Sequence, residues 1–577
     1  MSSNETTPTA PTAKPVKETK AQKSERLKLE KNPWEAWQDV RDFAKQGIDS
    51  VAPDWAHFYF KWWGIYTQGD GVGAVGGVGG EGKATEYFMM RIGVPNGIVT
   101  SSQLRVIADL IRDHARGIGD ITTRQNIQMH WLTIQSLPEV VDALEKVGLS
   151  PKGACGDVVR NVTGNTLAGV DKQELIDASP LALKVARTLT ANPDYFNLPR
   201  KFKIAITGSP TWDCYPEIND IALTPATRVV NGKTEIGYSL RVGGGLSREP
   251  HVAVKLNCFL PEDKAEAAVY GVTDNFREQC GLRESRTHAR MKYLFLAEGW
   301  TAEKFLAAVE GKLGYKLDAA GDEIVPNDDY RDHAGIHPQK QAGLSYVGAS
   351  VITGRMTSDQ FHKVADLADQ YGSGEIRCTI TQNFVIINVP NEKAQALAAE
   401  LKAIGIEVQP NQFFRGTVAC TGTEFCKLAI TETKGFAKWL AEEMEGRMPG
   451  FAEHLRINIT GCPNNCGQAW VADIGLEGKK VKHEGVLQDA YYFAVGGALG
   501  QHAGFARQIN YRAVATQVPE AIEHLLTGYL KDRTEGENLR SWFARTDDEH
   551  LRTLAAGHHV RAVDHDKDVA RSPAGVD

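Results

Sequence analysis

The sequence predicts an internally duplicated α+β protein, and three observations support this. The segments 99–110 and 356–367 share a Thr-Ser start and an amphipathic helical pattern. Each is followed by a segment that carries Gln-Asn, and then by a second helical segment. A second pair of segments, 203–210 and 456–463, shares the pattern Ile-x-Ile-Thr-Gly-x-Pro. Repeats that recur in the same order indicate two copies of one architecture.

The first repeated unit predicts helices flanked by strands, which is an α+β arrangement of ferredoxin-like type. The predicted elements are helices 99–110 and 137–147 around a strand at 122–126, and helices 356–367 and 391–404 around a strand at 379–383. The second repeated unit predicts a further α+β domain in each half. We therefore expect two ferredoxin-like half-domains and two α+β domains, related by pseudo-two-fold symmetry.

A chain of 577 residues is long enough for several domains. We expect a disordered tail and lead-in at 1–45, a first ferredoxin-like half-domain at 46–148, a first α+β domain at 149–318, a second ferredoxin-like half-domain at 319–410 and a second α+β domain at 411–577. Residues 1 to about 32 have almost no large apolar side chains, so order is expected to begin near Trp34.

Composition excludes several classes of protein. The net charge of −7 argues against a general nucleic-acid binder. No window approaches eighteen apolar residues, so no membrane span is expected. Nine cysteines in a chain of this length do not predict a disulfide framework. Together with the lack of an apolar signal region, these features lead us to expect a cytoplasmic protein.

The segment 69–82 is very rich in glycine, and Gly71, Gly73 and Gly76 match the pattern G-x-G-x-x-G. A dinucleotide site would also need a strand before this pattern and a helix after it, and neither is predicted. We therefore interpret the segment as a surface loop.

Four cysteines form two close pairs, Cys420 with Cys426 and Cys462 with Cys466. Paired cysteines of this kind hold a [4Fe–4S] cube or a zinc ion. The five residues between Cys420 and Cys426 exceed the usual spacing of structural zinc sites, which favours the cube. Buried cysteines without a metal remain the alternative.

The first half of the chain lacks the second cysteine pair, because Ser209 and Asp213 stand where the repeat has Cys462 and Cys466. A duplicated protein with one cluster has room for a second cofactor across its pseudo-symmetric interface. The first half instead carries cations within short, mostly apolar runs, where solvated charges are less expected. These are Arg91, Arg124, Arg160, Arg200, Lys201, Lys203, Arg290 and Lys292. Each alone is typical of a solvated surface, but together they indicate a cavity for a polyanion.

These motifs resemble those of the assimilatory sulfite and nitrite reductases that hold sirohaem and a [4Fe–4S] cluster. The resemblance covers about residues 50–545 and rests on Cys-x5-Cys, Gly-Cys-Pro-Asn-Asn-Cys-Gly-Gln, Thr-Thr-Arg-Gln-Asn, Arg-Asn-x-x-Gly-Asn and Leu-Pro-Arg-Lys-x-Lys. It implies two ferredoxin-like half-domains and two α+β domains that bind sirohaem and the cluster.

The resemblance also implies a role for each residue. Cys420, Cys426, Cys462 and Cys466 would hold the cube, and Cys466 would also bridge to the sirohaem iron. Arg124, Gln125, Arg200, Arg290 and Lys292 would bind the eight carboxylates of sirohaem. Arg91, Arg160, Lys201 and Lys203 would line the face where the substrate anion binds iron. Tyr66 and Cys155 match positions that a thioether joins in some sulfite-reducing members.

The expected reaction is the six-electron reduction of sulfite to sulfide, with nitrite to ammonium as the alternative. Lys203 favours sulfite, because sulfite-reducing members tend to carry lysine there and a dianion gains more from a second ammonium. The segments 242–247 and 424–428 also resemble the sulfite branch, whereas 160–169 resembles the nitrite branch.

The sequence shows no credible dinucleotide or flavin domain, so a separate carrier must supply electrons. We expect reduced ferredoxin as the donor, a small anion as the substrate, and a monomer. Two other classes compete with this interpretation, a non-catalytic electron carrier that holds only the cube and a structural zinc protein.

Overall fold

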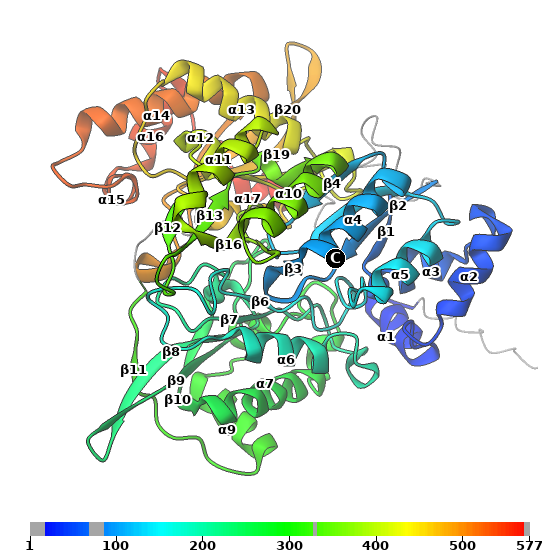
Figure 1. The fold of residues 1–577 in the computed structure, drawn as a ribbon. Coiled ribbons are helices and arrows are strands. Elements are labelled where there is room, and N and C mark those ends of the chain that lie inside the picture. The colour runs from blue at the N-terminus through cyan, green and yellow to red at the C-terminus, as the bar shows by residue number, and fades with distance from the viewer. Residues whose placement is uncertain (1–17, 69–85, 327–331, 571–577) are drawn as a thin grey trace, which may run out of the picture.

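The structure is a computed structural model that describes residues 18–68, 86–326 and 332–570 (Figure 1). The glycine-rich segment 69–82 lies outside the described residues. The described chain forms four sheets with helices packed against them. No helix among these residues is long and apolar enough to cross a membrane.

The two ferredoxin-like half-domains complete each other's sheets. The first sheet has the order β1-β2-β5-β4-β14 and the second β12-β13-β16-β15-β3, so β14 and β3 each belong to the opposite half. The first sheet comprises β1 (Ile65–Gln68), β2 (Tyr87–Ile92), β5 (Ile127–Leu132), β4 (Ile118–Ile121) and β14 (Arg355–Thr357). The second comprises β12 (Gly335–Pro338), β13 (Leu344–Ala349), β16 (Phe384–Pro390), β15 (Glu375–Cys378) and β3 (Ile98–Thr100). The half-domains therefore share one hydrophobic core.

The predicted helices of both half-domains are present. They are α4 (Ser101–His114), α5 (Leu137–Lys146), α10 (Ser358–Tyr371) and α11 (Ala394–Ala403). Helices α4 and α10 begin with the same capping box, Thr100 with Gln103 and Thr357 with Gln360. The two helices pack against each other, and Arg105 of α4 forms an ion pair with Asp366 of α10 (Figure 1).

The Gln-Asn segments are turns, so the predicted strands at 122–126 and 379–383 are wrong. These residues connect β4 to β5 and β15 to β16. Gln125 and Gln382 have φ of 57° and 65°, a left-handed conformation that cannot continue a strand. The duplication therefore extends to the turns.

Each α+β domain has its own sheet and its own hydrophobic core. The first sheet comprises β10 (Val254–Pro261), β9 (Lys233–Val242), β8 (Ile221–Val230), β7 (Ile204–Ile206) and β6 (Thr163–Gly164), with β11 (Asp322–Glu323) paired to β8. The second comprises β17 (Thr417–Ala419), β18 (Ile457–Thr460), β19 (Ile474–His483), β20 (Val486–Val495) and β21 (Arg507–Val514).

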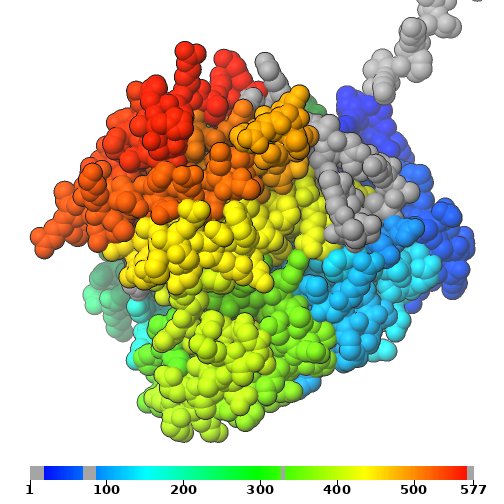
Figure 2. Space-filling model, turned by 90° about the horizontal axis from the view of Figure 1, so that it is seen from above, coloured from blue at the N-terminus to red at the C-terminus, as the bar shows by residue number. Residues whose placement is uncertain are grey.

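Helices cover both of these sheets. In the first domain they are α6 (Ser179–Leu189), α7 (Glu262–Arg277), α8 (Lys292–Leu296) and α9 (Ala302–Leu313). In the second they are α12 (Gln412–Gly416), α13 (Lys434–Arg447), α14 (Val518–Asp532), α15 (Leu539–Arg545), α16 (Asp548–Ala556) and α17 (His565–Ala570). From above, the second α+β domain (yellow to red) adjoins both half-domains (Figure 2).

A matching pair of hydrogen bonds supports the predicted duplication of these domains. The main-chain N–H of Lys203 donates to Asp220 at 2.9 Å, and that of Arg456 donates to Asp473 at 2.8 Å. Both pairs lie at the same place in the repeated pattern, so equivalent aspartates fix the start of β7 and of β18.

The N-terminal segment differs from its prediction. Residues 20–30 form helix α1 (Lys20–Glu30), so the expectation that order begins near Trp34 is wrong. A capping box between Thr19 and Gln22 starts this helix, and Lys28 on it is buried. Helices α2 (Trp37–Gln46) and α3 (Pro53–His57) follow, and the rings of Trp37 and Trp63 stack 3.9 Å apart.

Asp120 joins three domains at the centre of the molecule. Its carboxylate, 1% exposed, lies 3.0 Å from Arg355 of β14, 3.1 Å from His130 and 3.7 Å from Lys434 of α13. Burial acts to raise the pKa of Asp120, but Lys434, His130 and Arg355 outweigh it and hold the pKa well below its usual range. The carboxylate therefore offsets the charges of Arg355 and Lys434.

We expect Asp120→Asn to lower the free energy of unfolding by about 3 kcal/mol, because it leaves buried cations without their counter-ion. Since the folded pKa lies below the unfolded value of 3.8, this stabilisation is present above that value and is lost as the pH falls toward the folded pKa. Urea unfolding at several pH values measures it. The control Asp366→Asn removes an exposed ion pair with Arg105 and should cost under about 1 kcal/mol. Equal losses in both variants would contradict the role of Asp120.

Candidate functional site

The four predicted ligand cysteines converge at one edge of the second α+β domain. Cys420 follows β17, and Cys462 and Cys466 follow β18, which pairs with β17 in parallel. Parallel strands bring their carboxyl ends to the same edge, so both loops meet there. Cys426 follows the short turn η9 (Gly422–Glu424) and completes the group.

These four cysteines influence one another's pKa values. Burial raises the pKa of Cys426 to about 12, and Cys466 and Cys420 contribute to that rise. Burial, followed by repulsion from the other three cysteines, raises the pKa of Cys462 well above its usual value. Protonated thiols are poor ligands, so a bound cluster would stabilise the thiolates that this environment disfavours.

The four cysteines match the ligand set of a [4Fe–4S] cube, which takes one thiolate at each of four iron atoms. Within the described ranges, no group of three or more His, Cys, Asp or Glu side chains is arranged to hold a single metal ion.

The loops around the cysteines depend on glycine at two positions. Gly422 has φ of 69°, and a Cβ there would meet Thr433. A Cβ on Gly467 would clash with the carbonyl oxygen of Ile459. Both glycines therefore allow main chain to pack tightly behind the cysteines.

A turn from the first half reaches the last cysteine. The Thr123 hydroxyl donates to the carbonyl oxygen of Cys466 at 3.4 Å, and the Gln468 amide donates to the carbonyl oxygen of Thr123 at 3.5 Å. Thr123 lies in the predicted Thr-Thr-Arg-Gln-Asn motif. The motif therefore joins the cation-rich half to the cysteine site.

Several predicted cations gather around Cys466. Burial acts to lower the pKa of Arg91, but Cys155, Tyr66, Cys466 and Cys426 outweigh it and raise the value. Burial, together with Arg200 and Arg290, lowers the pKa of Lys201 to about 8, while Cys466 acts in the opposite direction. Arg91 and Lys201 are therefore close enough to Cys466 for its charge to influence both.

A second group of cations lies next to the first. Burial lowers the pKa of Arg124 to about 9, and Arg160 and Arg290 contribute. The pKa of Lys203 falls well below its usual value because of burial, Arg124 and Arg290. Burial and Arg290 lower the pKa of Lys292 to about 7. These cations lower one another's pKa values. The group therefore carries more positive charge than the neighbouring carboxylates offset.

Protein groups hold some of these cations in place. Arg290 forms an ion pair with the fully buried Asp220 at 2.8 Å, and Arg200 lies 3.5 Å from Asp157. Arg124 donates to Asn219 at 2.9 Å and to the carbonyl oxygen of Asn161 at 2.8 Å, while its buried Nε has no hydrogen-bond partner. Sequence analysis did not identify Asp220 or Asp157 as supporting residues, although Asp220 lies in a repeated Asp-Ile pair.

Two of the residues predicted to bind carboxylates have other contacts. Gln125 is fully buried, and its amide donates to and accepts from the main chain of Gly164 at 3.0 and 3.1 Å. Lys292 donates to the carbonyl oxygens of Leu246 and Glu249. The contacts of Gln125 are structural, and those of Lys292 hold it beside Arg290.

Arg91 and Arg160, the two arginines predicted to line the substrate face, are fixed by main chain and by a glutamine. Arg91 donates to Gln128 at 2.7 Å, and Arg160 donates to the carbonyl oxygen of Gly156 at 2.8 Å. Arg91 also donates to the sulfur of Cys155 at 3.1 Å. Burial and Cys155 raise the pKa of Tyr66, whose hydroxyl forms a hydrogen bond with Cys155. The structure thus brings Tyr66 and Cys155 together beside Arg91; a covalent link between them stays a prediction.

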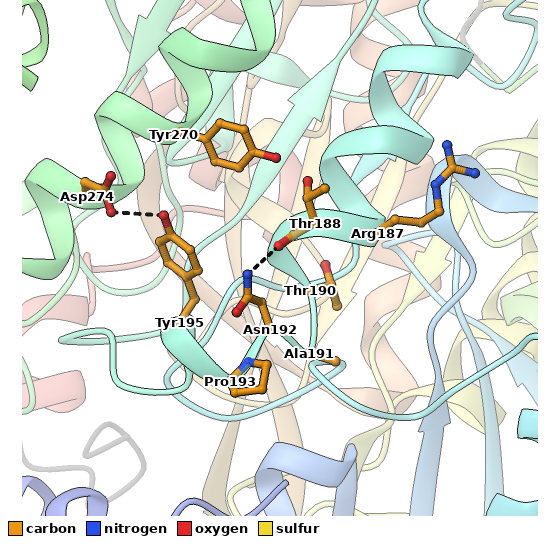
Figure 3. Close-up of a pocket in the computed structure, with 9 residues that line it drawn as sticks. All are labelled: Arg187, Thr188, Thr190, Ala191, Asn192, Pro193, Tyr195, Tyr270 and Asp274. Atoms are coloured by element: carbon orange, nitrogen blue, oxygen red, sulfur yellow. Dashed lines mark hydrogen bonds between the residues drawn. The ribbon is translucent and has the colours of Figure 1, made fainter. Parts of the chain in front are cut away.

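A surface hollow of about 800 Å³ lies elsewhere, beside α6 and α7 (Figure 3). It is lined by Arg187, Thr188, Thr190, Ala191, Asn192, Pro193, Tyr195, Tyr270 and Asp274. None of the predicted site residues lines it. The hollow is therefore separate from the cysteines and cations of the predicted site.

The residues around this site fit two cofactors. Four mutually close cysteines suit a [4Fe–4S] cluster. The surplus of cations, with a buried Arg124 Nε left without a partner, suits a group that carries several carboxylates. Cys466 lies where the two sets of residues meet, so one sulfur can serve both groups.

Comparisons with known proteins agree with this assignment. The chain matches the nitrite and sulphite reductase 4Fe-4S domain at residues 155–317 and 411–560. It matches the nitrite/sulfite reductase ferredoxin-like half domain at residues 81–147 and 337–404. These matches follow the duplicated order of the fold.

Individual relatives are similar over most of their length. An assimilatory ferredoxin-dependent nitrite reductase of Haloferax mediterranei is 38% identical, covering 87% of this chain and 88% of the relative. A sulfite reductase [ferredoxin] of Mycolicibacterium paratuberculosis is 36% identical, covering 88% and 92%. The structure of Mycobacterium tuberculosis NirA protein aligns with a TM-score of 0.86 at 34% identity, covering 92% and 97%.

The fold, the cysteine site and these matches lead to the same conclusion. The predicted α+β architecture with repeated ferredoxin-like half-domains is confirmed. The predicted cofactors, sirohaem and a [4Fe–4S] cluster, are those of this family. The chain belongs to the nitrite and sulfite reductase family of oxidoreductases.

Proposed function

We propose that this protein reduces sulfite to sulfide by six electrons that reduced ferredoxin supplies. The observation that carries this proposal is the surplus of partly buried cations next to the cysteine loops. When bound, sirohaem coupled to the cluster supplies electrons one at a time and an iron that binds the anion. Arg124, Arg200, Arg290 and Lys292 would hold its carboxylates, and Cys420, Cys426, Cys462 and Cys466 would hold the cluster.

Arg91 and Arg160 would bind and orient the substrate anion. Their hydrogen bonds to Gln128 and to the Gly156 carbonyl oxygen fix both guanidinium groups before substrate arrives. Donors that are held in place need no reorganisation as negative charge develops on the leaving oxygens. This preorganisation supports a catalytic role for both arginines.

Lys201 is suited to deliver protons. Its pKa of about 8 lies near neutral pH, where an acid can both hold and release a proton effectively. The reduction of sulfite releases oxygen as water and so consumes protons. The charge of Cys466, the proposed iron ligand, influences the pKa of Lys201, and this supports the role.

Lys203 supports sulfite over nitrite. It lies among Arg124, Arg290 and Lys201, and all three lower its pKa. An anion of higher charge offsets this repulsion more strongly, because the Coulomb energy scales with the charge. Sulfite is a dianion near neutral pH and nitrite is a monoanion, so the ammonium of Lys203 favours sulfite.

Nitrite reduction to ammonium is the second candidate. The relative at 38% identity is named as a nitrite reductase, whereas the one at 36% is named as a sulfite reductase. The segment 160–169 also resembles the nitrite branch. Similar identity to both kinds of enzyme supports some activity on each anion.

Ferredoxin is the proposed donor because relatives of both kinds carry it in their names. We further propose that the protein works as a monomer in the cytoplasm. The proposed function is tested by measuring the turnover of both anions by purified holoenzyme with reduced ferredoxin. Visible absorption typical of sirohaem without turnover of sulfite would contradict it, and turnover of nitrite alone would favour the second candidate.

The bridging role of Cys466 is tested by Cys466→Ser. We expect the variant to lose the cluster or its coupling to the haem, because one sulfur serves both groups. Iron content and the visible and paramagnetic resonance spectra measure this. The control is Cys280→Ser, since Cys280 is an exposed cysteine outside the site. Unchanged iron and spectra in Cys466→Ser would remove Cys466 from this role.

The proton-delivery role of Lys201 is tested by Lys201→Ala. We expect turnover to fall by about 10²-fold or more with both cofactors retained. Because the ammonium is the active form, wild-type turnover should decline as the pH rises through the pKa of Lys201, and the variant should lack this decline. The control is Lys172→Ala, since the side chain of Lys172 is exposed. Near-normal turnover of Lys201→Ala would place Lys201 outside the reaction.

The selective role of Lys203 is tested by Lys203→Asn. We expect sulfite turnover to fall far more than nitrite turnover, because the dianion loses more Coulomb energy. Steady-state rates on both anions with the same reduced donor measure the ratio. An equal fall on both anions would contradict selectivity, and weaker haem retention at an unchanged ratio would make Lys203 a carboxylate-binding residue instead.

A further inference from the structure

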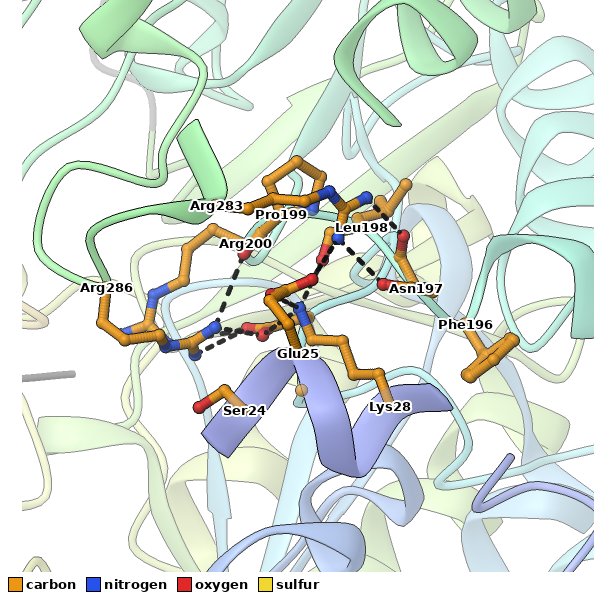
Figure 4. Close-up of polar contacts among 12 residues, drawn as sticks. Ser24, Glu25, Lys28, Phe196, Asn197, Leu198, Pro199, Arg200, Arg283 and Arg286 are labelled. Atoms are coloured by element: carbon orange, nitrogen blue, oxygen red, sulfur yellow. Dashed lines mark hydrogen bonds and ion pairs between the residues drawn. The ribbon is translucent and has the colours of Figure 1, made fainter. Parts of the chain in front are cut away.

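The segment 196–200 leads directly into the site cations Lys201 and Lys203, and its main chain is held by side chains from elsewhere in the fold. Four consecutive carbonyl oxygens each accept a hydrogen bond. Figure 4 shows the last three of these residues, Asn197, Leu198 and Pro199, with Lys28, Arg283 and Arg286 around them. The donors are Trp62 to Phe196 at 2.8 Å, Arg283 to Asn197 at 2.9 Å, Lys28 to Leu198 at 2.9 Å and Arg286 to Pro199 at 3.5 Å. The segment 196–200 belongs to no helix or strand, and these side-chain donors hold its main chain in place.

Lys28 is the contribution of helix α1 to this arrangement. Its side chain is completely buried, and its ammonium lies 2.6 Å from Glu25 and 3.0 Å from Asp157. Figure 4 shows Lys28 projecting from α1 toward Leu198, with Glu25 beside it. A buried ammonium is stable only when carboxylates and hydrogen-bond acceptors surround it. The Lys28 ammonium is therefore held between Glu25, Asp157 and the carbonyl oxygen of Leu198.

Asp157 links Lys28 to the site. Its carboxylate lies 3.0 Å from Lys28, 2.5 Å from Arg286 and 3.5 Å from the site residue Arg200. Burial acts to raise the pKa of Asp157, but Arg286, Lys28 and Arg200 outweigh it and hold the value well below its usual range. Lys28 and Arg286 make the shorter contacts with Asp157, and Arg200 makes the longer one.

Helix α1 also has contacts that fix its position. The Tyr59 hydroxyl donates to the carbonyl oxygen of Leu27 at 2.9 Å, and Arg283 forms an ion pair with Glu25 at 2.6 Å. Arg283 also donates to the side chain and main chain of Asn197. One arginine thus binds the helix and the segment 196–200 together.

We propose that Lys28 is a positioning residue for the anion site, and that α1 aims Arg200, Lys201 and Lys203 by holding the segment 196–200. This inference rests on the proposed function for the role of those cations. Without the Lys28 ammonium, Asp157 would draw Arg200 closer and away from a cofactor carboxylate. The main chain at Leu198 would also lose the hydrogen bond that fixes the approach to Lys201.

The test compares Lys28→Met, which keeps the length of the side chain without its charge, with Lys23→Met. Lys23 lies on the same helix, but it is about half exposed and forms an ion pair with Asp54. Hydrogen exchange of the peptide 196–203 in holoenzyme measures the segment itself. We expect exchange to be roughly 10²-fold faster in Lys28→Met and unchanged in Lys23→Met, since a buried ion pair is lost only in the first.

The site is measured by the KM for sulfite and by haem retention. We expect the KM to rise about tenfold in Lys28→Met with a smaller change in kcat, because the defect is in how the anion is held. The variant Lys28→Arg keeps a cation and should restore part of the affinity. A merely structural role would change exchange without changing the KM or the haem content, and that result overturns the proposal, as does unchanged exchange.

A milder variant protects the test against misfolding of Lys28→Met. Glu25→Gln removes one carboxylate from both Lys28 and Arg283 and should give the same changes at smaller size. Wild-type exchange and KM in Glu25→Gln, in the absence of folded Lys28→Met, would overturn the proposal. Failure of the proposed function would instead appear in the wild type, as a lack of sulfite turnover, and leaves the exchange measurement valid.

Discussion

The exchange of strands between the two ferredoxin-like half-domains is the constraint on which the rest of the structure depends. Each sheet has an edge that only the other half can pair, β14 for the first and β3 for the second. Unpaired sheet edges expose main-chain hydrogen-bonding groups, so neither half is complete alone. From these joined half-domains, the turn at Thr123 reaches the loop of Cys466 in the second α+β domain. The candidate site therefore exists only in the assembled chain.

The two halves share one architecture but contribute different side chains to the site, cysteines from the second half and cations from the first. In the second half the repeated loop presents Cys462 and Cys466. In the first half Ser209 donates to Asp171 at 2.5 Å, and Asp213 lies 2.8 Å from His333, all of them buried. Burial acts to lower the pKa of His333, but Asp213 outweighs it and raises the value. A hydrogen bond between Asp213 and His333 therefore holds this loop. The first half instead supplies cations across the interface, so duplication leads to one site with two contributions.

The cation cavity shows how a site can be stable and still suited to anions. Asp220 and Asp157 hold individual cations, yet the pKa of Lys201, Lys203, Arg124 and Lys292 is lowered, so repulsion remains. A cofactor with many carboxylates and an anionic substrate would both relieve that repulsion. The main-chain contacts that hold the segment 196–200 prevent the cations from separating in the meantime. Anionic ligands would therefore bind more tightly because they relieve the repulsion between these cations.

The sequence by itself determined the duplication and the helices with their Thr-x-x-Gln caps, because each depends on local pattern. By residue type and spacing it also predicted the ligand cysteines and the cations of the site. The same capping signal stands at Thr19 and Gln22, in a segment with few apolar residues. Only the tertiary structure decided that the Gln-Asn segments are turns, that Gln125 binds Gly164, and that Lys28 and Asp157 support the site. These features depend on contacts between residues far apart in the chain, such as Lys28 and Asp157, and on burial that gives a single charge its partner. A local pattern cannot specify such contacts, because the same lysine on an exposed helix would simply be solvated.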